Sequence, residues 1–226
     1  MIHIKLFQFN SFGAHCIILW DDGKRAVIVD PGYGRQDEKI LFHSFIRDNG
    51  LKPEKILLTH CHIDHVLGLA DCCRTYGLKA TFHSSDLFQL EDENVRQAGL
   101  LGFSYPAPEG IEYEFINDGD IISAGEITLE VIHTPGHTPG GVCYLCRDEK
   151  LLLSGDTLFA GAIGRTDIKG GDYDALMKSI MNGLMTLDGD IDVLPGHGNM
   201  TSIARERQTN PFLEPFNEPL DEDAEI

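Results

Sequence analysis

The chain has few basic residues, little tryptophan and no long apolar run. It contains 18 Lys and Arg against 36 Asp and Glu, so its net charge is −18, and it has one Trp among 226 residues. Such a charge repels nucleic acid and anionic membrane surfaces on average, and we expect neither as a partner. No apolar run approaches the roughly 20 residues of a membrane helix, and no basic segment followed by an apolar core opens the chain. We therefore expect a soluble, cytoplasmic protein.

Cysteine is present, but its spacing does not suit a disulfide framework. The six cysteines include the adjacent pair Cys72-Cys73, and we expect reduced, mostly buried thiols. Cys143 and Cys146 have C-x-x-C spacing, but they lie in a strand-like run where residues three apart point to opposite faces. The sequence therefore predicts a structural role for this second pair.

The length and composition predict one domain followed by a short tail. A chain of 226 residues with 42% hydrophobic and 24% charged residues is typical of a single globular domain. We assign residues 1–210 to this domain and the acidic residues 211–226 to a flexible tail. Residues 85–114 read as an insertion over the functional site, with a loop that carries Pro106 and Pro108. Apolar patterns predict strands over residues 2–8, 16–20, 26–30, 56–58, 79–83, 127–132, 142–146, 151–153 and 192–194, the first three as an antiparallel meander, and helices over 37–48, 66–76, 93–101, 172–187 and 202–208.

The densest group of chemically active residues follows the apolar run at residues 56–58. Residues 59–65 read Thr-His-Cys-His-Ile-Asp-His, which places His60, His62, Asp64 and His65 directly after a predicted buried strand. Imidazole nitrogen suits zinc and iron, and a carboxylate extends the choice to harder ions. The segment therefore predicts a site for a divalent transition metal.

Three later turns each place another ligand type beside glycine, after a predicted strand. They contain His137 in His-Thr-Pro-Gly-His-Thr-Pro-Gly-Gly, Asp156 in Ser-Gly-Asp-Thr and His197 in Pro-Gly-His-Gly. Glycine allows the backbone to turn sharply and to approach an ion closely. Seven ligands are too many for one tetrahedral zinc and suit two ions that share a carboxylate and a water. Asp156 is the natural bridge, because its two oxygens can each bind one ion.

The role of Asp30 stays open between two alternatives. It ends the third predicted strand before Pro31-Gly32, so it either caps this turn or forms a hydrogen bond to a metal ligand. The remaining histidines lack neighbouring ligand types, and we expect structural or solvated roles for His3, His15, His43, His83 and His133.

The H-x-H-x-D-H motif that begins at His60, with the later His, Asp and His, resembles the metallo-β-lactamase superfamily over residues 30 to 197. The segments around His137 and Asp156, and Gly164-Arg165-Thr166-Asp167, look like the glyoxalase II group of hydroxyacylglutathione hydrolases, in a single-domain form. The resemblance implies an α+β fold, a four-layer αββα sandwich of two mixed β-sheets with a metal pair at one edge. It also implies one ion on His60, His62 and His137, a second on Asp64, His65 and His197, and Asp156 as the bridge.

The chemistry expected of such a site is hydrolysis. Two cations about 3.5 Å apart lower the pKa of a shared water, and the resulting hydroxide attacks a carbonyl whose oxyanion the ions stabilise. Asp64 and Asp156 hold the ions around this hydroxide and count as catalytic. A thioester is the expected substrate, because its thiolate leaves without a proton donor. Arg165 either anchors a substrate carboxylate or forms a surface salt bridge. We expect two zinc ions, with iron or manganese as alternatives.

Other functions of the same superfamily compete with this hypothesis. A persulfide dioxygenase would use one iron on His62, His137 and Asp156. A lactonase is a further alternative, although Thr157-Leu158-Phe159 after Asp156 looks more like the thioesterases. A β-lactamase is less favoured, because that lineage offers cysteine or serine around the second ion. The favoured hypothesis is a dinuclear hydrolase of S-2-hydroxyacylglutathione or a related small thioester, and the sequence makes no prediction of its oligomeric state.

Overall fold

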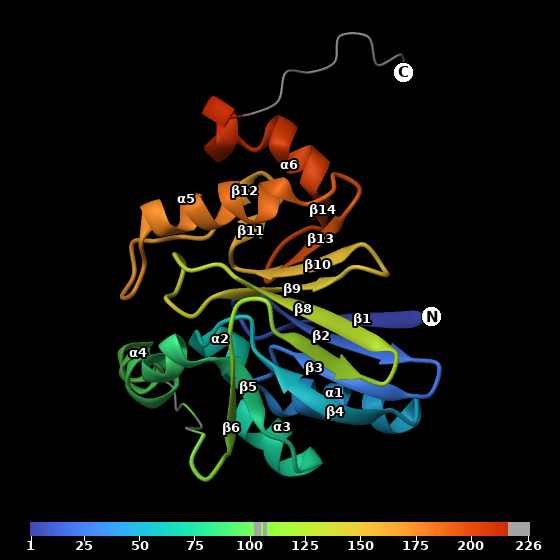
Figure 1. The fold of residues 1–226 in the computed structure, drawn as a ribbon. Helices are drawn as coiled ribbons and strands as arrows, with labels where there is room; N and C mark the ends of the chain where they lie inside the picture. The colour runs from blue at the N-terminus through green and yellow to red at the C-terminus, as the bar shows by residue number, and fades with distance from the viewer. Residues whose placement is uncertain (102–104, 106–107, 217–226) are drawn as a thin grey trace.

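The chain forms four layers, with two β-sheets face to face and helices on both outer faces (Figure 1). The structure is a computed structural model that describes residues 1–101, 105 and 108–216. One apolar cluster joins the first sheet to α1 (Gln36–Asp48) and α3 (Leu69–Tyr76), and a second fills the space between the sheets. A third joins the second sheet to α6 (Ile203–Thr209), and a fourth packs α5 (Tyr173–Asn182) against Leu213 and Ile163. The predicted α+β sandwich of two mixed sheets is confirmed.

The first sheet begins as the predicted antiparallel meander and continues with parallel strands. β1 pairs with β2 and β2 with β3 in antiparallel fashion, whereas β3 to β6 are parallel neighbours. The carboxyl ends of β3 and β4 therefore lie at the same edge. The strands, in the order in which they pair, are β1 (Ile2–Phe9), β2 (Ala14–Asp21), β3 (Arg25–Val29), β4 (Lys52–Leu57), β5 (Ala80–His83) and β6 (Tyr113–Ile116).

The second sheet has the order β14-β13-β10-β9-β8-β7. β10 and β13 are parallel, and β9 runs antiparallel to both β8 and β10. Consequently β8, β10 and β13 run in the same direction and end at one edge. The strands are β7 (Ile121–Ala124), β8 (Ile127–His133), β9 (Val142–Cys146), β10 (Leu151–Gly155), β13 (Asp192–Pro195) and β14 (Thr201–Ser202), and β11 (Leu158–Phe159) with β12 (Ala162–Ile163) forms a separate hairpin.

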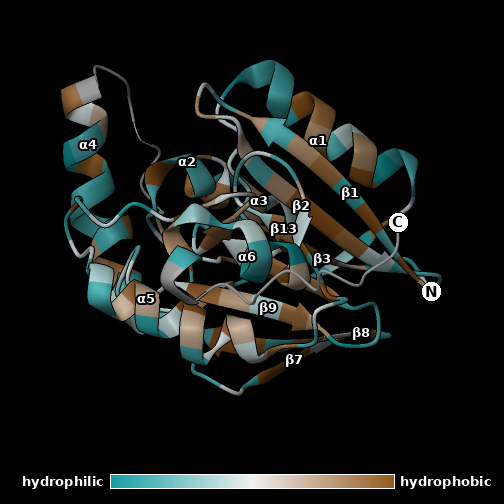
Figure 2. Cartoon of the chain, turned by 90° about the horizontal axis from the view of Figure 1, so that it is seen from above, coloured by the Kyte–Doolittle hydropathy of each residue, from teal (hydrophilic) through white to brown (hydrophobic). Residues whose placement is uncertain are grey.

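Two-residue alternation along the central strands divides the core between the two faces of each sheet. In β2, Cys16 and Ile18 face the outer helices, while Ile17 and Leu19 face the other sheet. In β9, Cys143 and Cys146 lie in different clusters, as their spacing predicts. Figure 2 shows these hydrophobic strands between helices of mixed polarity. All six cysteines are free and buried.

The helices differ from the predicted ones at two glycines. The helix predicted over 66–76 is two helices, because Gly68 interrupts it. A Cβ at Gly68 would lie 2.6 Å from the Tyr33 ring. The Gly68 amide donates to the carbonyl oxygen of Pro31 at 2.8 Å. The helix predicted over 172–187 ends at Gly183, before a 3-10 turn at Leu184–Thr186. The α-helices are α1 (Gln36–Asp48), α2 (Ile63–Val66), α3 (Leu69–Tyr76), α4 (Asn94–Leu101), α5 (Tyr173–Asn182) and α6 (Ile203–Thr209).

Several short elements escaped the sequence analysis. These are the edge strands β6, β7 and β14, the β11–β12 hairpin, a 3-10 turn at Ser84–Asp86 and a π-helix at Gln89–Glu93. Residues 211–216, predicted as tail, form a 3-10 helix (Pro211–Phe216) in which Leu213 is buried, whereas residues 217–226 lie outside the described residues, as does Pro106 of the predicted loop. Within the described ranges, no helix has the length and hydrophobicity needed to cross a bilayer.

Candidate metal centre

The strand directions bring all seven predicted ligands to one edge of the sandwich. β4 of the first sheet leads into residues 59–65, and β8, β10 and β13 of the second sheet lead to His137, Asp156 and His197. Parallel strands that end at one edge hold the loops that follow them close together. The side chains converge as two groups of three, with one carboxylate between the groups.

The first group consists of His60, His62 and His137, whose ligand atoms all lie within 4.8 Å of one another. His62 Nδ1 is 2.9 Å from His137 Nε2. His137 Nδ1 donates a hydrogen bond to the carbonyl oxygen of Arg165 at 2.8 Å. With the proton on Nδ1, the lone pair of His137 is on Nε2, which faces the other two histidines. His60 Nδ1 similarly contacts Thr59 Oγ1 at 3.1 Å.

The second group consists of Asp64, His65 and His197, with ligand atoms within the same limit. His197 Nε2 lies 3.2 Å from both Asp64 Oδ2 and His65 Nε2. α2 supplies Asp64 and His65 from adjacent positions, while His197 comes from the turn after β13. The two groups match the two ligand sets that the family resemblance implies.

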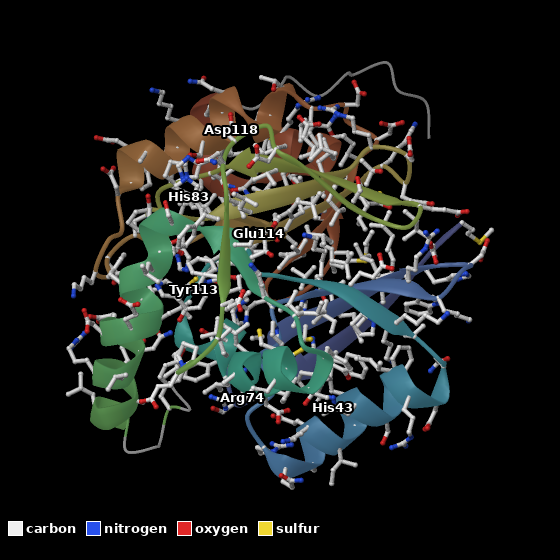
Figure 3. All side chains as sticks on the ribbon, turned by 60° about the horizontal axis from the view of Figure 1, so that its bottom comes forward. His43, Arg74, His83, Tyr113, Glu114 and Asp118 are labelled. Atoms are coloured by element: carbon white, nitrogen blue, oxygen red, sulfur yellow. The ribbon has the colours of Figure 1, made fainter. Side chains whose placement is uncertain are left out.

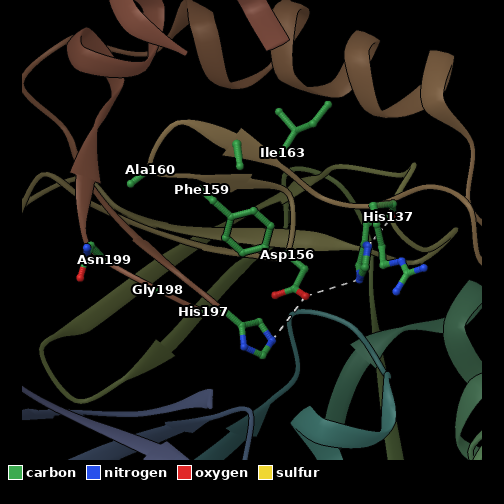
Figure 4. Close-up of a pocket in the computed structure, with 10 residues that line it drawn as sticks. His137, Asp156, Phe159, Ala160, Ile163, His197, Gly198 and Asn199 are labelled. Carbon is green, nitrogen blue, oxygen red and sulfur yellow. Dashed lines mark hydrogen bonds and ion pairs between the residues drawn. The ribbon is translucent and has the colours of Figure 1, made fainter. Parts of the chain in front are cut away.

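Asp156 lies between the two groups, and Figure 4 shows one of its oxygens between His137 of the first group and His197 of the second. Oδ2 is 3.6 Å from Nε2 of both His137 and His197, and Oδ1 is 3.5 Å from His65 Nε2. Two ligands bound at about 2.0–2.2 Å to one tetrahedral ion lie roughly 3.3–3.6 Å apart. The separations therefore suit atoms that share an ion better than atoms that share a proton.

Two buried atoms of the centre lack a hydrogen-bond partner. They are His60 Nε2 and Asp156 Oδ1, for which the described residues offer none. Buried polar atoms are almost always satisfied in folded proteins, so an orphaned nitrogen and an orphaned carboxylate oxygen at one point favour a cation. The residues present therefore fit a pair of divalent metal ions.

The electrostatics of the two groups differ. Burial and the neighbouring imidazoles lower the pKa of His60 far below its ordinary value, and burial with His137 lowers the pKa of His62 to about 3. Burial also lowers the pKa of His65, but Asp64, Asp156 and Asp30 outweigh it and raise the value to about 10. His60 and His62 are therefore neutral near pH 7 and offer lone pairs, while the carboxylates around His65 favour its protonated form when no metal is bound.

Asp30 is buried against the centre rather than capping its own turn. Its carboxylate accepts hydrogen bonds from the Thr59 amide at 2.7 Å and from Thr59 Oγ1 at 2.6 Å, and contacts His65 Nδ1 at 3.1 Å. Asp30 thus joins the start of the ligand loop to a ligand ring, as in the second alternative left open by the sequence. Its φ of +51° lies in the left-handed region, which Asp and Asn tolerate better than other non-glycine residues.

Glycine is required where the backbone approaches the ligands. A Cβ at Gly196 would lie 2.1 Å from Asp156 Oδ1 and 2.9 Å from the His65 ring. Gly155 has a φ of +49°, and a Cβ there would lie 2.5 Å from Thr59 Oγ1. No side chain fits at either position, which is the physical reason for the glycines beside His197 and Asp156.

The sequence analysis missed Asp86, which is fully buried beside the first group. Its carboxylate accepts from the Cys61 amide at 3.1 Å, from Thr138 Oγ1 at 2.8 Å and from the Gly140 amide at 2.6 Å. It therefore ties the loop of His60 and His62 to the loop of His137. The signal that could have revealed it is its position in the turn after β5, three residues beyond the end of that strand, as Asp30 follows β3.

Replacing Asp86 with Ala should lower the free energy of unfolding by about 2–4 kcal/mol, because two buried amides and a hydroxyl lose their acceptor. Urea denaturation with chelator present would measure this effect without a contribution from bound metal. Asp22→Ala, at a position 64% exposed, is the matched control and should change stability by less than about 0.5 kcal/mol. Equal stabilities for the two variants would contradict a structural role of Asp86.

The other histidines have partners away from the two ligand groups. His15 Nδ1 contacts the Pro195 carbonyl at 2.7 Å and so supports the turn that carries His197. His43, labelled in Figure 3, contacts Tyr76 at 2.7 Å and Asp71 at 2.9 Å between α1 and α3. His83 at the end of β5 stacks on His133, with 4.1 Å between the ring centroids. His3 pairs with Asp22 at 2.8 Å.

A pocket of about 550 Å³ opens beside His137, Asp156 and His197 (Figure 4). Arg165 is at its margin, where its guanidinium pairs with Asp167 through contacts of 2.8 and 2.9 Å. The predicted surface salt bridge therefore exists, at a position that also lines the pocket. The apolar part of the lining consists of Phe159, Ala160, Ala162 and Ile163.

The αββα fold and the two His/Asp groups at its edge define the class of metal-dependent hydrolases with this sandwich. A family model described as the metallo-beta-lactamase superfamily matches residues 11–197. The chain belongs to this superfamily, as its motifs predict.

Three known proteins resemble the chain over most of their length. Hydroxyacylglutathione hydrolase GloC of Haemophilus influenzae is 34% identical, over 94% of this chain and 98% of the relative. The crystal structure of the BLEG-1 B3 metallo-beta-lactamase has a TM-score of 0.85 with 33% identity, over 93% of this chain and 99% of that one. The structure of TTHA1623 in a di-iron-bound form has a TM-score of 0.81 with 32% identity, over 92% and 100%.

Proposed function

We propose that the protein is a dinuclear metallohydrolase that cleaves thioesters of the S-2-hydroxyacylglutathione type. The observation that carries the proposal is the placement of Asp156 between two three-residue ligand groups, where it also lines a pocket. The similarity to a hydroxyacylglutathione hydrolase over almost its whole length supports the substrate class. A cytoplasmic location is part of the proposal, and the six free, buried thiols agree with a reducing compartment.

In this proposal each residue has a defined task. His60, His62 and His137 would hold one ion, Asp64, His65 and His197 would hold the other, and Asp156 would contribute to both. When bound, the ions supply Lewis acidity and an activated water. Asp30 orients His65, the Arg165 carbonyl orients His137, and the apolar wall around Phe159 excludes water from the bound acyl group.

A substrate panel tests the proposal on protein of measured metal content. S-lactoylglutathione, a simple acyl thioester, a lactone, a chromogenic cephalosporin and glutathione persulfide would be compared by kcat/KM. The expected result is two metal ions per chain and the highest kcat/KM with a thioester. One iron per chain with oxygen uptake on glutathione persulfide would instead establish the dioxygenase alternative, and turnover of the cephalosporin alone would establish a β-lactamase.

The metal in the proposal is zinc, with iron or manganese as alternatives. Imidazole and carboxylate ligands accept all three ions, so affinity for one metal does not follow from the ligand set. The di-iron form of TTHA1623 supports iron as the main alternative. Metal analysis of protein purified without added metal would distinguish them.

Replacing Arg165 with Ala should raise KM about fivefold for a substrate with a carboxylate and leave kcat nearly unchanged. The effect is small, because the guanidinium is 65% exposed and already paired with Asp167, and exposed ion pairs contribute at most about 1 kcal/mol. Arg35→Ala is the matched control, since Arg35 is 66% exposed and pairs with Asp37 in the same way outside the pocket. An unchanged KM in the Arg165 variant would show that Arg165 forms only the surface salt bridge and does not bind the substrate.

A further inference from the structure

Gln89 is a buried amide whose side chain ends beside a ligand of the first group. The residue is fully buried, and it begins the π-helix Gln89–Glu93, a distortion that often occurs at functional sites. Its amide nitrogen lies 3.4 Å from Nε2 of His62 and 3.4 Å from the carbonyl oxygen of Lys169. Its oxygen, Oε1, has no hydrogen-bond partner within the described part of the chain.

The two nitrogens of His62 have different surroundings. Nδ1 faces the other ligands, at 2.9 Å from His137 Nε2, while Nε2 faces Gln89. A neutral imidazole has one lone pair and one N–H. If the lone pair of Nδ1 is directed at an ion, the proton must be on Nε2, and this buried N–H then needs an acceptor.

The Gln89 amide provides this acceptor after a half-turn about its last side-chain bond. The oxygen and the NH2 group of an amide have nearly the same shape, so the turn exchanges them without repacking. It places the unpartnered oxygen at His62 Nε2 and gives up the 3.4 Å contact with Lys169, which is long for a hydrogen bond. Burial confines the amide to this place, and the π-helix itself is held by Lys169 Nζ, which donates to buried Glu93 at 3.1 Å.

We propose that Gln89 is a positioning residue that holds His62 in the tautomer with the proton on Nε2, so that Nδ1 is free to bind metal. The residue acts through His62 and touches neither the ions nor the substrate. This inference rests on the metal site of the proposed function. The tautomer of His62 is thus set by one side chain, Gln89, from the segment that precedes α4.

Metal affinity tests this role independently of catalysis. Competition with a chromophoric zinc chelator would give both affinities for the wild type, Gln89→Leu and Gln89→Glu. In the Leu variant the N–H of His62 loses its acceptor, and we expect one ion to bind about 10- to 100-fold more weakly while the other is unaffected. The Glu variant retains an oxygen at this position and should bind both ions as the wild type does.

The controls separate this inference from the proposed function and from misfolding. Gln208→Leu, at an exposed position on α6, should leave both affinities unchanged. Nitrogen-15 NMR of the zinc-loaded wild type needs no variant and should show a proton on His62 Nε2. A proton on Nδ1, wild-type affinities in Gln89→Leu, or equal weakening in the Leu and Glu variants would each overturn the inference. A wild type that binds no metal would instead overturn the proposed function.

Discussion

Replacing Asp156 with Asn should reduce kcat by on the order of 10³-fold and remove at least one metal ion per chain. The carboxylate reaches both ligand groups, because Oδ2 is 3.6 Å from Nε2 of both His137 and His197, and Oδ1 is 3.5 Å from His65 Nε2. An amide keeps only one of these two oxygens, and the NH2 group in place of the other cannot bind a cation. Bound metal lowers the activation free energy by several kcal/mol, and each 1.36 kcal/mol changes the rate about tenfold. Steady-state kinetics with metal analysis would measure both effects.

The control for this prediction is an Asp to Asn change of equal size elsewhere on the chain. Asp174→Asn, on the exposed side of α5, should retain wild-type activity and metal content. Retention of two ions and wild-type kcat in Asp156→Asn would show that Asp156 does not join the two groups, and a mononuclear or non-catalytic site would then be favoured. Loss of metal without loss of any activity would exclude a metal-dependent reaction.

Replacing Asp30 with Ala should lower the free energy of unfolding by about 3–5 kcal/mol. The Thr59 amide, the Thr59 hydroxyl and His65 Nδ1 all lose a buried partner. Each lost hydrogen bond costs about 1–3 kcal/mol, and relaxation of the site offsets part of the sum. Alanine also tolerates the left-handed backbone at φ +51° less well than aspartate. We expect Asp30→Asn to lose about half as much, because it keeps one acceptor oxygen and suits this conformation.

Urea denaturation with chelator present would measure these differences without metal linkage. Lys24→Ala is a matched control, since Lys24 also has a positive φ, of +68°, but its side chain is exposed. That change should alter stability by less than about 0.5 kcal/mol. With metal present, Asp30→Ala should weaken binding to the group of His65 by about 10- to 100-fold. An unfolding free energy of Asp30→Ala close to that of the wild type would show that the Asp30 contacts make no net contribution to stability.

The sequence by itself determined the family, the four-layer fold and which side chains are candidates to bind metal. These depend on local signals: apolar runs of strand length, the glycines that follow them, and ligand types beside those glycines. The central strands β2, β3, β9 and β10 are buried on both faces and are therefore unmistakably apolar. The roles of the individual ligands remain predictions, but their side chains meet in the two groups that the motifs imply.

Only the tertiary structure decided the contacts that hold those ligands. The edge strand β6 is half exposed and carries a weak pattern, and the break at Gly68 arises from the Tyr33 ring packed against it. Asp86 and Gln89 are ordinary polar residues in a segment without a motif, and their importance comes from burial beside loops distant in sequence. The sequence states which side chains can bind metal, because that is a property of each residue. Which buried groups orient them depends on how distant segments pack, and this is specified only by the folded chain.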